Sequence, residues 1–285
     1  MIPAEFDYVA AESVEEAVRH LRENGEDAKL LAGGHSLIPL MKLRLASPAV
    51  LIDVARLTDL SYIRDGGDHI AIGALTRHHD IEHSDVLKTD VPILAHVAGL
   101  VGDPQVRHRG TIGGSLAHGD PASDLPAVLL ALNGTIVAES ENARREIAAQ
   151  DFFLDYLMTA LEPHEVVTEI RMADPTGFGG GYQKFNRRSE DWAMVAVTAL
   201  VKQEGGVVSD VRIGLTHMAG TPLRASAAED ALRGQPLNAE SIAQASALAA
   251  DGTSPPGDLN ATPDYKRHLA QVLCKRALHQ AAGTA

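Results

Sequence analysis

The N-terminal part of the chain alternates between helix and strand patterns. Apolar side chains between residues 14 and 21 repeat at i, i+3, i+4 and i+7, which is the spacing of an amphipathic helix. Ser13 and Glu16 are spaced as a capping box at its start, and Gly25 is a stop signal at its end. Another helical pattern covers residues 36–45. Short apolar runs predict strands at residues 6–9, 29–32 and 49–54.

From residue 60 onward the pattern becomes that of a sheet with a few helices. The turn Asp65-Gly66-Gly67-Asp68 joins two short segments, which is typical of a β-hairpin. Pro92 stands at the first turn of an amphipathic helix, where its missing N–H costs nothing. An apolar run at residues 125–132 predicts a further helix. The other expected elements are strands at 62–64, 69–73, 135–137 and 165–172, and a hairpin or helix pair between 145 and 161.

The C-terminal part predicts a small unit of its own. Glycine density peaks at residues 174–181, and we expect the domain boundary there. Three strand patterns (182–187, 193–201, 207–218) then precede three helical patterns (224–232, 239–250, 264–280). We therefore predict an α+β chain. A first domain at 1–176, divided into subdomains 1–57 and 58–176, is followed at 177–285 by a three-stranded antiparallel sheet with a helical bundle.

Composition limits the partners and the location of the protein. The chain has 285 residues, enough for about two domains. Its formal charge of −13 argues against nucleic acid or an anionic membrane as a partner, because both need clustered Lys and Arg. The longest stretch without Asp, Glu, Lys or Arg, residues 125–138, is shorter than the ~20 apolar residues of a membrane-spanning helix. With no targeting segment recognisable at the start, we expect a cytoplasmic protein.

Cys274 is the only cysteine of the chain. An intramolecular disulfide is therefore impossible, and so is an iron–sulfur cluster held by this chain alone, because such a cluster needs about four thiolates. The residue falls in a helical pattern, and we interpret it as a small packed side chain.

Two glycine pairs stand at the start of predicted helices, and the first also follows a predicted strand, a common position for an anion site. Neither fits the dinucleotide motif G-x-G-x-x-G, and Asp120 occupies the place of the phosphate-binding Lys in a Walker loop. What remains is a pair that lets backbone N–H groups approach a diphosphate without an intervening Cβ. Taken singly, such a pair is more often a simple turn. The two loops are Ala32-Gly33-Gly34-His35-Ser36-Leu37 and Thr111-Ile112-Gly113-Gly114-Ser115.

Basic residues flank both loops. Arg107 and Arg109 precede the second loop, and Lys42 and Arg44 follow the first. Because the overall charge is negative, we expect these side chains to balance the charge of an anionic ligand from a distance.

His79-Asp80-Ile81-Glu82-His83 matches the inverted zinc-protease pattern H-x-x-E-H. Such a site needs both histidines on one helical face and a distant third ligand. The segment is short and strongly polar, and short motifs match by chance. We interpret it as a solvated helical turn.

The two loops, together with Pro39, Lys42 and Asp124, closely resemble the FAD-binding subunit of the molybdenum hydroxylases. This is the group of xanthine dehydrogenase and aerobic carbon monoxide dehydrogenase. The resemblance covers essentially the whole chain, and residues 118–124 are most similar to the medium subunit of the aerobic carbon monoxide dehydrogenases. It implies a two-part FAD-binding domain of the vanillyl-alcohol oxidase (PCMH) type, followed by a small C-terminal domain.

The resemblance also implies the residues of an FAD site. Both glycine loops would hold the FAD diphosphate through main-chain donors, and Asp124 matches a carboxylate placed on the FAD. Val167 falls where a main-chain contact to the flavin is made, and Lys184 matches a lysine near the flavin ring. Trp192 sits where relatives carry an aromatic close to the isoalloxazine. Judged by burial habits alone, this tryptophan is instead a core or interface residue.

In this family the substrate is oxidised on another subunit. The resemblance implies that electrons leave a molybdenum cofactor on a large subunit, cross [2Fe-2S] clusters on a small subunit, reduce FAD here and pass to an external acceptor. No catalytic or metal-binding residue is then expected on this chain, which the lone Cys274 fits. The expected assembly is a dimer of heterotrimers, in the cytoplasm or attached to the inner face of the membrane through the complex.

Other functions stay open at this point. A self-sufficient flavin oxidase of the same fold is one, although the ~105 residues after the glycine-rich stretch are few for a separate catalytic domain. The medium subunit of a related heterocycle, aldehyde or xanthine dehydrogenase is another. A third is a cofactor-free scaffold whose glycine loops are only turns.

Overall fold

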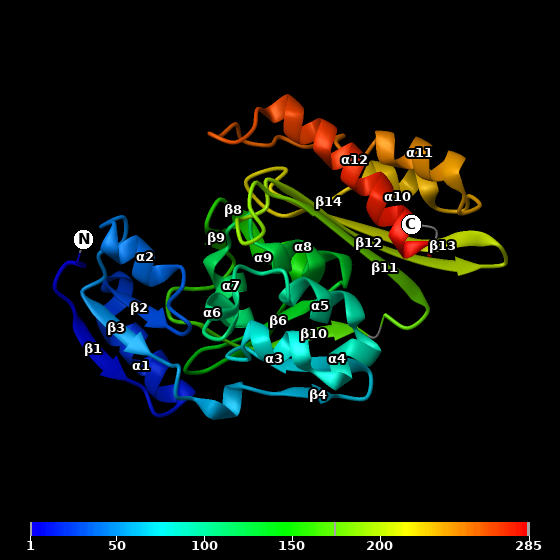
Figure 1. Cartoon of the computed structure of the whole chain (residues 1–285). Coiled ribbons are helices and arrows are strands. Elements are labelled where there is room, and N and C mark those ends of the chain that lie inside the picture. Colours follow the sequence, from blue (N-terminus) through cyan, green and yellow to red (C-terminus); the bar gives the residue numbers. More distant parts are fainter. Residues whose placement is uncertain (1, 174, 284–285) are drawn as a thin grey trace.

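The computed structural model describes residues 2–173 and 175–283. Its N-terminal part, blue in Figure 1, consists of β1 (Asp7–Ala10), α1 (Val14–Asn24), β2 (Ala28–Leu31), α2 (Leu37–Lys42) and β3 (Val50–Asp53), with 3₁₀ turns at Gly25–Asp27 and Thr58–Leu60. The strands form a parallel sheet in the order β1-β3-β2. Ser13 caps α1 as predicted, but the Glu16 carboxylate accepts the amide of Glu12 and not that of Ser13. Every element predicted here is present.

The middle part is built around a five-stranded antiparallel sheet. Its strands are β4 (Ile63–Asp65), β5 (His69–Gly73), β6 (Thr135–Glu139), β7 (Arg144–Ala148) and β10 (Val166–Ala173), and a separate hairpin is formed by β8 (Phe153–Asp155) and β9 (Met158–Thr159). The order is β4-β5-β10-β6-β7, so the predicted closing strand β10 is the central one. A bulge between Val167 and Glu169 interrupts its pairing with β6. Bulges often re-aim side chains beside functional sites.

Helices of the middle part separate its sheet from the C-terminal unit. They are α3 (His78–His83), α4 (Asp85–Asp90), α5 (Pro92–Ala98), α6 (Pro104–Arg107), α7 (Ile112–His118), α8 (Asp124–Ala131) and α9 (Ala149–Phe152). All residues of α8 are buried, which explains why its sequence is apolar on every side. A Cβ on Gly214 would lie 2.2 Å from the carbonyl oxygen of Ala127, so only glycine lets the C-terminal sheet approach α8 this closely.

The C-terminal part packs a sheet between α8 and a layer of helices (Figure 1). Its elements are β11 (Phe178–Phe185), β12 (Val195–Glu204), β13 (Val207–Thr216), β14 (Leu223–Arg224), α10 (Ser226–Leu232), α11 (Ala239–Ala247) and α12 (Pro263–Ala281). Along β12, Val195 and Val197 belong to the core under the helices, whereas Ala196 and Leu200 belong to the core of the middle part. The sheet has four strands and not three, because the two-residue β14 is too short to give a periodic pattern.

The glycine-rich stretch before this sheet is largely a packing feature. A Cβ on Gly179 or Gly181 would lie 2.0 or 2.1 Å from the carbonyl oxygen of Ala281 or Ala277, so β11 needs these glycines where α12 crosses it. Gly177, with φ of 85°, forms the preceding turn. The domain division at residues 176 and 177 stays a prediction. Among the described residues, no helix combines the length and the apolar character that crossing a membrane requires.

Glu169 on β10 is the most heavily bonded carboxylate of the middle sheet. It accepts hydrogen bonds from Tyr62 (2.5 Å), Arg64 (3.0 Å), Arg144 (3.3 Å) and Arg171 (2.5 Å), and it is 2% exposed. Burial alone would raise its pKa, but the hydrogen bonds from Tyr62 and Arg171 and the charge of Arg171 outweigh burial and lower the pKa to about 2.

Replacement of Glu169 is therefore expected to change how stability depends on acid. A carboxylate whose folded-state pKa is depressed stabilises the fold above its ordinary pKa, and this contribution disappears as the pH falls toward about 2. Glu169→Gln should lower the free energy of unfolding at pH 7 by up to about 3 kcal/mol. Between pH 4.5 and about 2 the variant should lose less stability than the wild type. Urea unfolding across this pH range measures both the loss of stability at pH 7 and its dependence on pH. Glu26→Gln, at an exposed position, is the control. Parallel curves of stability against pH for the wild type and Glu169→Gln would contradict the account.

Candidate functional site

A cavity of about 660 Å³ is lined by residues from all three parts of the chain. Of the residues predicted for the site, Ile112 alone does not line it, because its side chain is buried in the middle core. The structure therefore brings together segments that are far apart in the sequence. The predicted residues on the wall are Ala32, Gly33, Gly34, His35, Ser36, Leu37, Thr111, Gly113, Gly114, Ser115, Asp124, Val167, Lys184 and Trp192.

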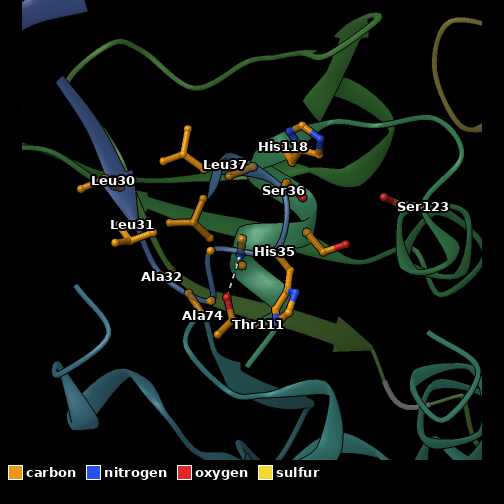
Figure 2. Close-up of a pocket in the computed structure, with 18 of the residues that line it drawn as sticks. Leu30, Leu31, Ala32, His35, Ser36, Leu37, Ala74, Thr111, His118 and Ser123 are labelled. Atoms are coloured by element: carbon orange, nitrogen blue, oxygen red, sulfur yellow. Dashed lines mark hydrogen bonds between the residues drawn. The ribbon is translucent and has the colours of Figure 1, made fainter. Parts of the chain in front are cut away.

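The two glycine loops lie against each other on the wall of this cavity, where Figure 2 labels Ala32, His35, Ser36, Leu37 and Thr111. A Cβ on Gly33 would lie 2.3 Å from the carbonyl oxygen of Arg109 and 2.8 Å from the Cα of Gly110. Both contacts are with backbone, which has no side-chain freedom to move aside. Gly34 has a φ of 78°, in the left-handed region that favours glycine. The first pair is thus required by the close approach of the two loops and by the turn itself.

The open main-chain donors lie in the first loop. Within the described part of the chain, the amides of Gly33, Gly34, His35 and Ser36 donate no hydrogen bond. Consecutive free N–H groups next to glycines form the kind of concavity that binds anions. A diphosphate fits this arrangement because no Cβ of the glycine pair stands before the amides.

The second loop differs from the expectation that its amides also bind the ligand. The amides of Ile112, Gly113 and Ser115 are bonded to Thr76, Ala74 and Thr111 at 3.0, 2.8 and 3.0 Å. Only the Gly114 amide is weakly held, by the Thr111 hydroxyl at 3.3 Å (dashed in Figure 2). Thr111 caps α7, and the loop is anchored on the segment after β5. We conclude that this loop supplies a rigid wall, the Gly114 amide and the Ser115 side chain.

The basic residues that flank the loops in sequence do not line the cavity. Lys42, Arg44, Arg107 and Arg109 are absent from its wall, and the guanidinium of Arg107 donates to Glu82 at 2.9 Å. These four side chains therefore do not line the site, and their role as distant balancing charges stays a prediction. The lysines that do line the cavity are Lys29 and Lys184.

Asp124 and Lys184 form a buried ion pair at the cavity wall. The Lys184 ammonium donates to Asp124 Oδ2 at 2.9 Å and to the carbonyl of Leu100 at 3.1 Å, and the Tyr182 hydroxyl donates to Asp124 Oδ1 at 2.7 Å. Burial raises the pKa of Asp124, although Lys184 and Tyr182 oppose this. Burial and the charge of Asp124 raise the pKa of Tyr182 well above its ordinary value. The predicted carboxylate and lysine thus act as one unit.

Sequence reasoning missed Tyr182 and His78. Tyr182 precedes Lys184 by two positions on β11, so period-two alternation places both on one face of the strand. His78 lines the cavity beside the loops, is buried, and has an Nδ1 atom without a partner among the described residues. Burial, followed by the charges of Arg107 and His35, lowers the pKa of His78 to about 4, so the ring is neutral at pH 7.

Trp192 and Val167 line the cavity from the C-terminal part and from the bulge of β10. Trp192 is 56% exposed, so the interpretation as a core residue is wrong. An exposed tryptophan on a cavity wall is available to cover a planar ring or to meet a partner protein.

Comparison with known proteins decides the family. Residues 4–174 match the model of the FAD binding domain in molybdopterin dehydrogenase, and residues 181–281 match that of the CO dehydrogenase flavoprotein C-terminal domain. The chain belongs to this flavoprotein family. The resemblance inferred from the sequence and the predicted fold class are both confirmed.

Relatives of this flavoprotein match over their full length. The carbon monoxide dehydrogenase medium chain of Hydrogenophaga pseudoflava is 44% identical over 282 residues, covering 99% of this chain and 98% of that one. A solved structure of carbon monoxide dehydrogenase from the same organism, which lacks the Mo-pyranopterin moiety, has a TM-score of 0.97 at 45% identity, with both chains fully covered. The glyceraldehyde dehydrogenase medium chain of Sulfolobus acidocaldarius is 38% identical, covering 99% of this chain and 100% of that one.

The flavoprotein is therefore an oxidoreductase subunit, and its cofactor is FAD. The residues of the cavity fit FAD. The first loop offers free amides for a diphosphate, and the Asp124–Lys184 pair offers polar atoms at the wall.

Proposed function

We propose that this flavoprotein is the electron-transfer subunit of an aerobic carbon monoxide dehydrogenase. It holds FAD in the cavity that both glycine loops line and, through FAD, carries electrons from [2Fe-2S] clusters of a small subunit to an external acceptor. Bound FAD supplies the redox chemistry, while the chain positions the group and tunes its surroundings. A large subunit with the molybdenum cofactor oxidises the substrate.

The observation that carries this proposal is a cavity whose residues fit FAD, in a chain whose single cysteine cannot hold an iron–sulfur cluster. Cys274 is buried, and burial together with the charge of Glu229 raises the pKa of its thiol to about 12. Such a thiol is a packed side chain and not a cluster ligand. The full-length match to medium chains of carbon monoxide dehydrogenase supports the same division of labour.

The cavity suggests a role for each part of the site. The amides of Gly33 to Ser36 bind the diphosphate, helped by the Gly114 amide and the Ser115 side chain. Asp124, held by Lys184 and Tyr182, would offer its carboxylate to the cofactor, and Lys184 would stand near the flavin ring. The main chain at Val167 contacts the flavin from the bulge of β10. Trp192 covers the isoalloxazine at the exposed end of the cavity.

The partners follow from the same proposal. We infer a small iron–sulfur subunit and a large molybdenum subunit, assembled as a dimer of heterotrimers in the cytoplasm. The glyceraldehyde dehydrogenase medium chain is nearly as similar as the carbon monoxide dehydrogenase chains, so an aldehyde or heterocycle is the alternative substrate class.

Anaerobic reduction of the complex tests the proposed function. The chain is purified with the two partner subunits, and the visible flavin band is followed after addition of carbon monoxide, an aldehyde or an N-heterocycle in separate cuvettes. We expect carbon monoxide to bleach the flavin in the complex and none of the substrates to bleach it in the chain alone. Bleaching only by the aldehyde or the heterocycle would show that this compound, and not carbon monoxide, is the substrate of the complex. Turnover of an organic substrate by the isolated chain would replace the proposed function with a self-sufficient flavin oxidase.

A further inference from the structure

The H-x-x-E-H segment forms a cluster of ligand atoms on the surface of α3. One potential ligand atom from each of His79, Glu82 and His83 lies within 4.8 Å of the other two. The segment is helical, so residues at i, i+3 and i+4 share one face. The sequence-based interpretation required a distant third ligand, whereas Glu82 of the same helix turn completes a set of three.

The imidazole rings are already arranged by their neighbours. His83 Nδ1 lies 2.8 Å from the carbonyl oxygen of His79, which fixes the proton on Nδ1 and leaves Nε2 as the free ligand atom. The ring of His79 is stacked on that of His108, with centroids 4.0 Å apart and planes at 24°. Metal-bound histidines commonly donate their second ring N–H to a backbone carbonyl, as His83 does here.

The carboxylate is oriented by a cation outside the cluster. Arg107 Nε donates to Glu82 Oε2 at 2.9 Å, and Arg107 also donates to the carbonyl oxygens of Val101 and Gly102. Arg107 thereby fixes the carboxylate of Glu82 beside the imidazole of His83, whose Nδ1 lies 3.9 Å from Glu82 Oε2. A ligating carboxylate is commonly held by such an outer-shell hydrogen bond.

We propose that His79, Glu82 and His83 bind one divalent transition-metal ion, with zinc as the type metal. Two imidazoles and one carboxylate form a donor set that suits Zn²⁺, and a fourth position is left for water or a partner's ligand. The negative net charge of the chain also favours a cation at the surface. The role is structural, because the ion would stiffen α3 and hold the stacked contact between His79 and His108, the residue after α6. Helix α3 also carries His78, which lines the FAD cavity.

Calorimetric titration of the untagged full chain with Zn²⁺, after removal of metals with EDTA, tests the site. We expect one ion per chain, and a rise in the thermal midpoint on Zn²⁺ addition that EDTA reverses. His79→Ala and His83→Ala should each weaken Zn²⁺ binding by about tenfold or more. Glu82→Gln should also weaken Zn²⁺ binding, because it removes the negative charge while keeping a side chain of nearly the same size and shape. His164→Ala, which changes an exposed histidine outside the cluster, should bind as the wild type does.

Co²⁺ provides the decisive comparison, because its visible spectrum reports coordination and does not depend on flavin reduction. A tetrahedral-type Co²⁺ band in the wild type that is absent from His79→Ala/His83→Ala would support the site. Equal Zn²⁺ affinity in the wild type and in this double variant would overturn it. So would a wild-type protein that binds no ion while its circular dichroism shows the native fold. The FAD content of each variant is measured in parallel, so that a failure of this site is distinguished from a failure of the flavin site.

Discussion

Gly33→Ala is expected to weaken FAD binding by about tenfold or more in a chain that still folds. The new Cβ would lie 2.3 Å from the carbonyl oxygen of Arg109, so the two loops must move apart. Overpacking of this kind costs about 1–3 kcal/mol. The cost falls on the free amides that hold the diphosphate, and each ~1.4 kcal/mol lowers affinity tenfold. We expect the FAD-to-protein ratio to drop by about tenfold or more, measured by absorption after gel filtration.

Two further variants distinguish a specific loss of FAD binding from general destabilisation of the fold. Gly180→Ala is the matched control, because its Cβ would meet Ile93 at an ordinary 3.5 Å, and it should retain FAD. Gly114→Asp places a carboxylate at the cavity wall and should expel an anionic ligand by repulsion. Wild-type occupancy in Gly33→Ala would show that the loops do not clamp the cofactor. Wild-type occupancy in Gly114→Asp would place the diphosphate elsewhere.

Lys184→Met is expected to cause the largest loss of stability at the site. The substitution keeps an apolar stem of similar length but leaves Asp124 buried without its cation. Removal of one partner of a buried ion pair costs about 3–5 kcal/mol. The pKa of Asp124 is already raised by burial, and without Lys184 it rises further. An acid whose folded-state pKa is raised destabilises the fold above that pKa, so the deficit of the variant should shrink as the pH falls.

Urea unfolding at several pH values measures this effect. Tyr182→Phe removes one hydrogen bond to the same carboxylate and is the graded comparison, with an expected loss of about 1–2 kcal/mol. A Lys184→Met variant that is equally destabilised at every pH would show that Asp124 does not remain charged when its partner is removed. A variant as stable as the wild type would show that the pair is not buried as described.

Much of the fold followed from local patterns. The helix at α1, the hairpin of β4 and β5, and the three C-terminal helices each have a period, a cap or a turn residue that acts within a few positions. The glycine loops were also recognisable, because each glycine pair stands at a helix start and the first follows directly on a strand. Their meeting in one cavity rested on resemblance and not on any pattern.

What the sequence did not reveal depends on contacts between distant segments. The packing of α7 determines that the Gly113 amide donates to the carbonyl of Ala74. The packing of α6 likewise brings Arg107 to the carboxylate of Glu82. The same holds for Gly179 and Gly181 of β11, whose packing against α12 could not be recognised from the glycine density alone. His78 and Tyr182 carry no motif, and only their burial beside the cavity and the ion pair reveals them.

Release of the cofactor by acid, followed by chromatography, tests the central claim most directly. The chain, purified alone or with its partners, is denatured, and the released flavin is identified and quantified against protein. The account predicts FAD, at close to one molecule per folded chain. A folded, colourless protein that releases no FAD would contradict it.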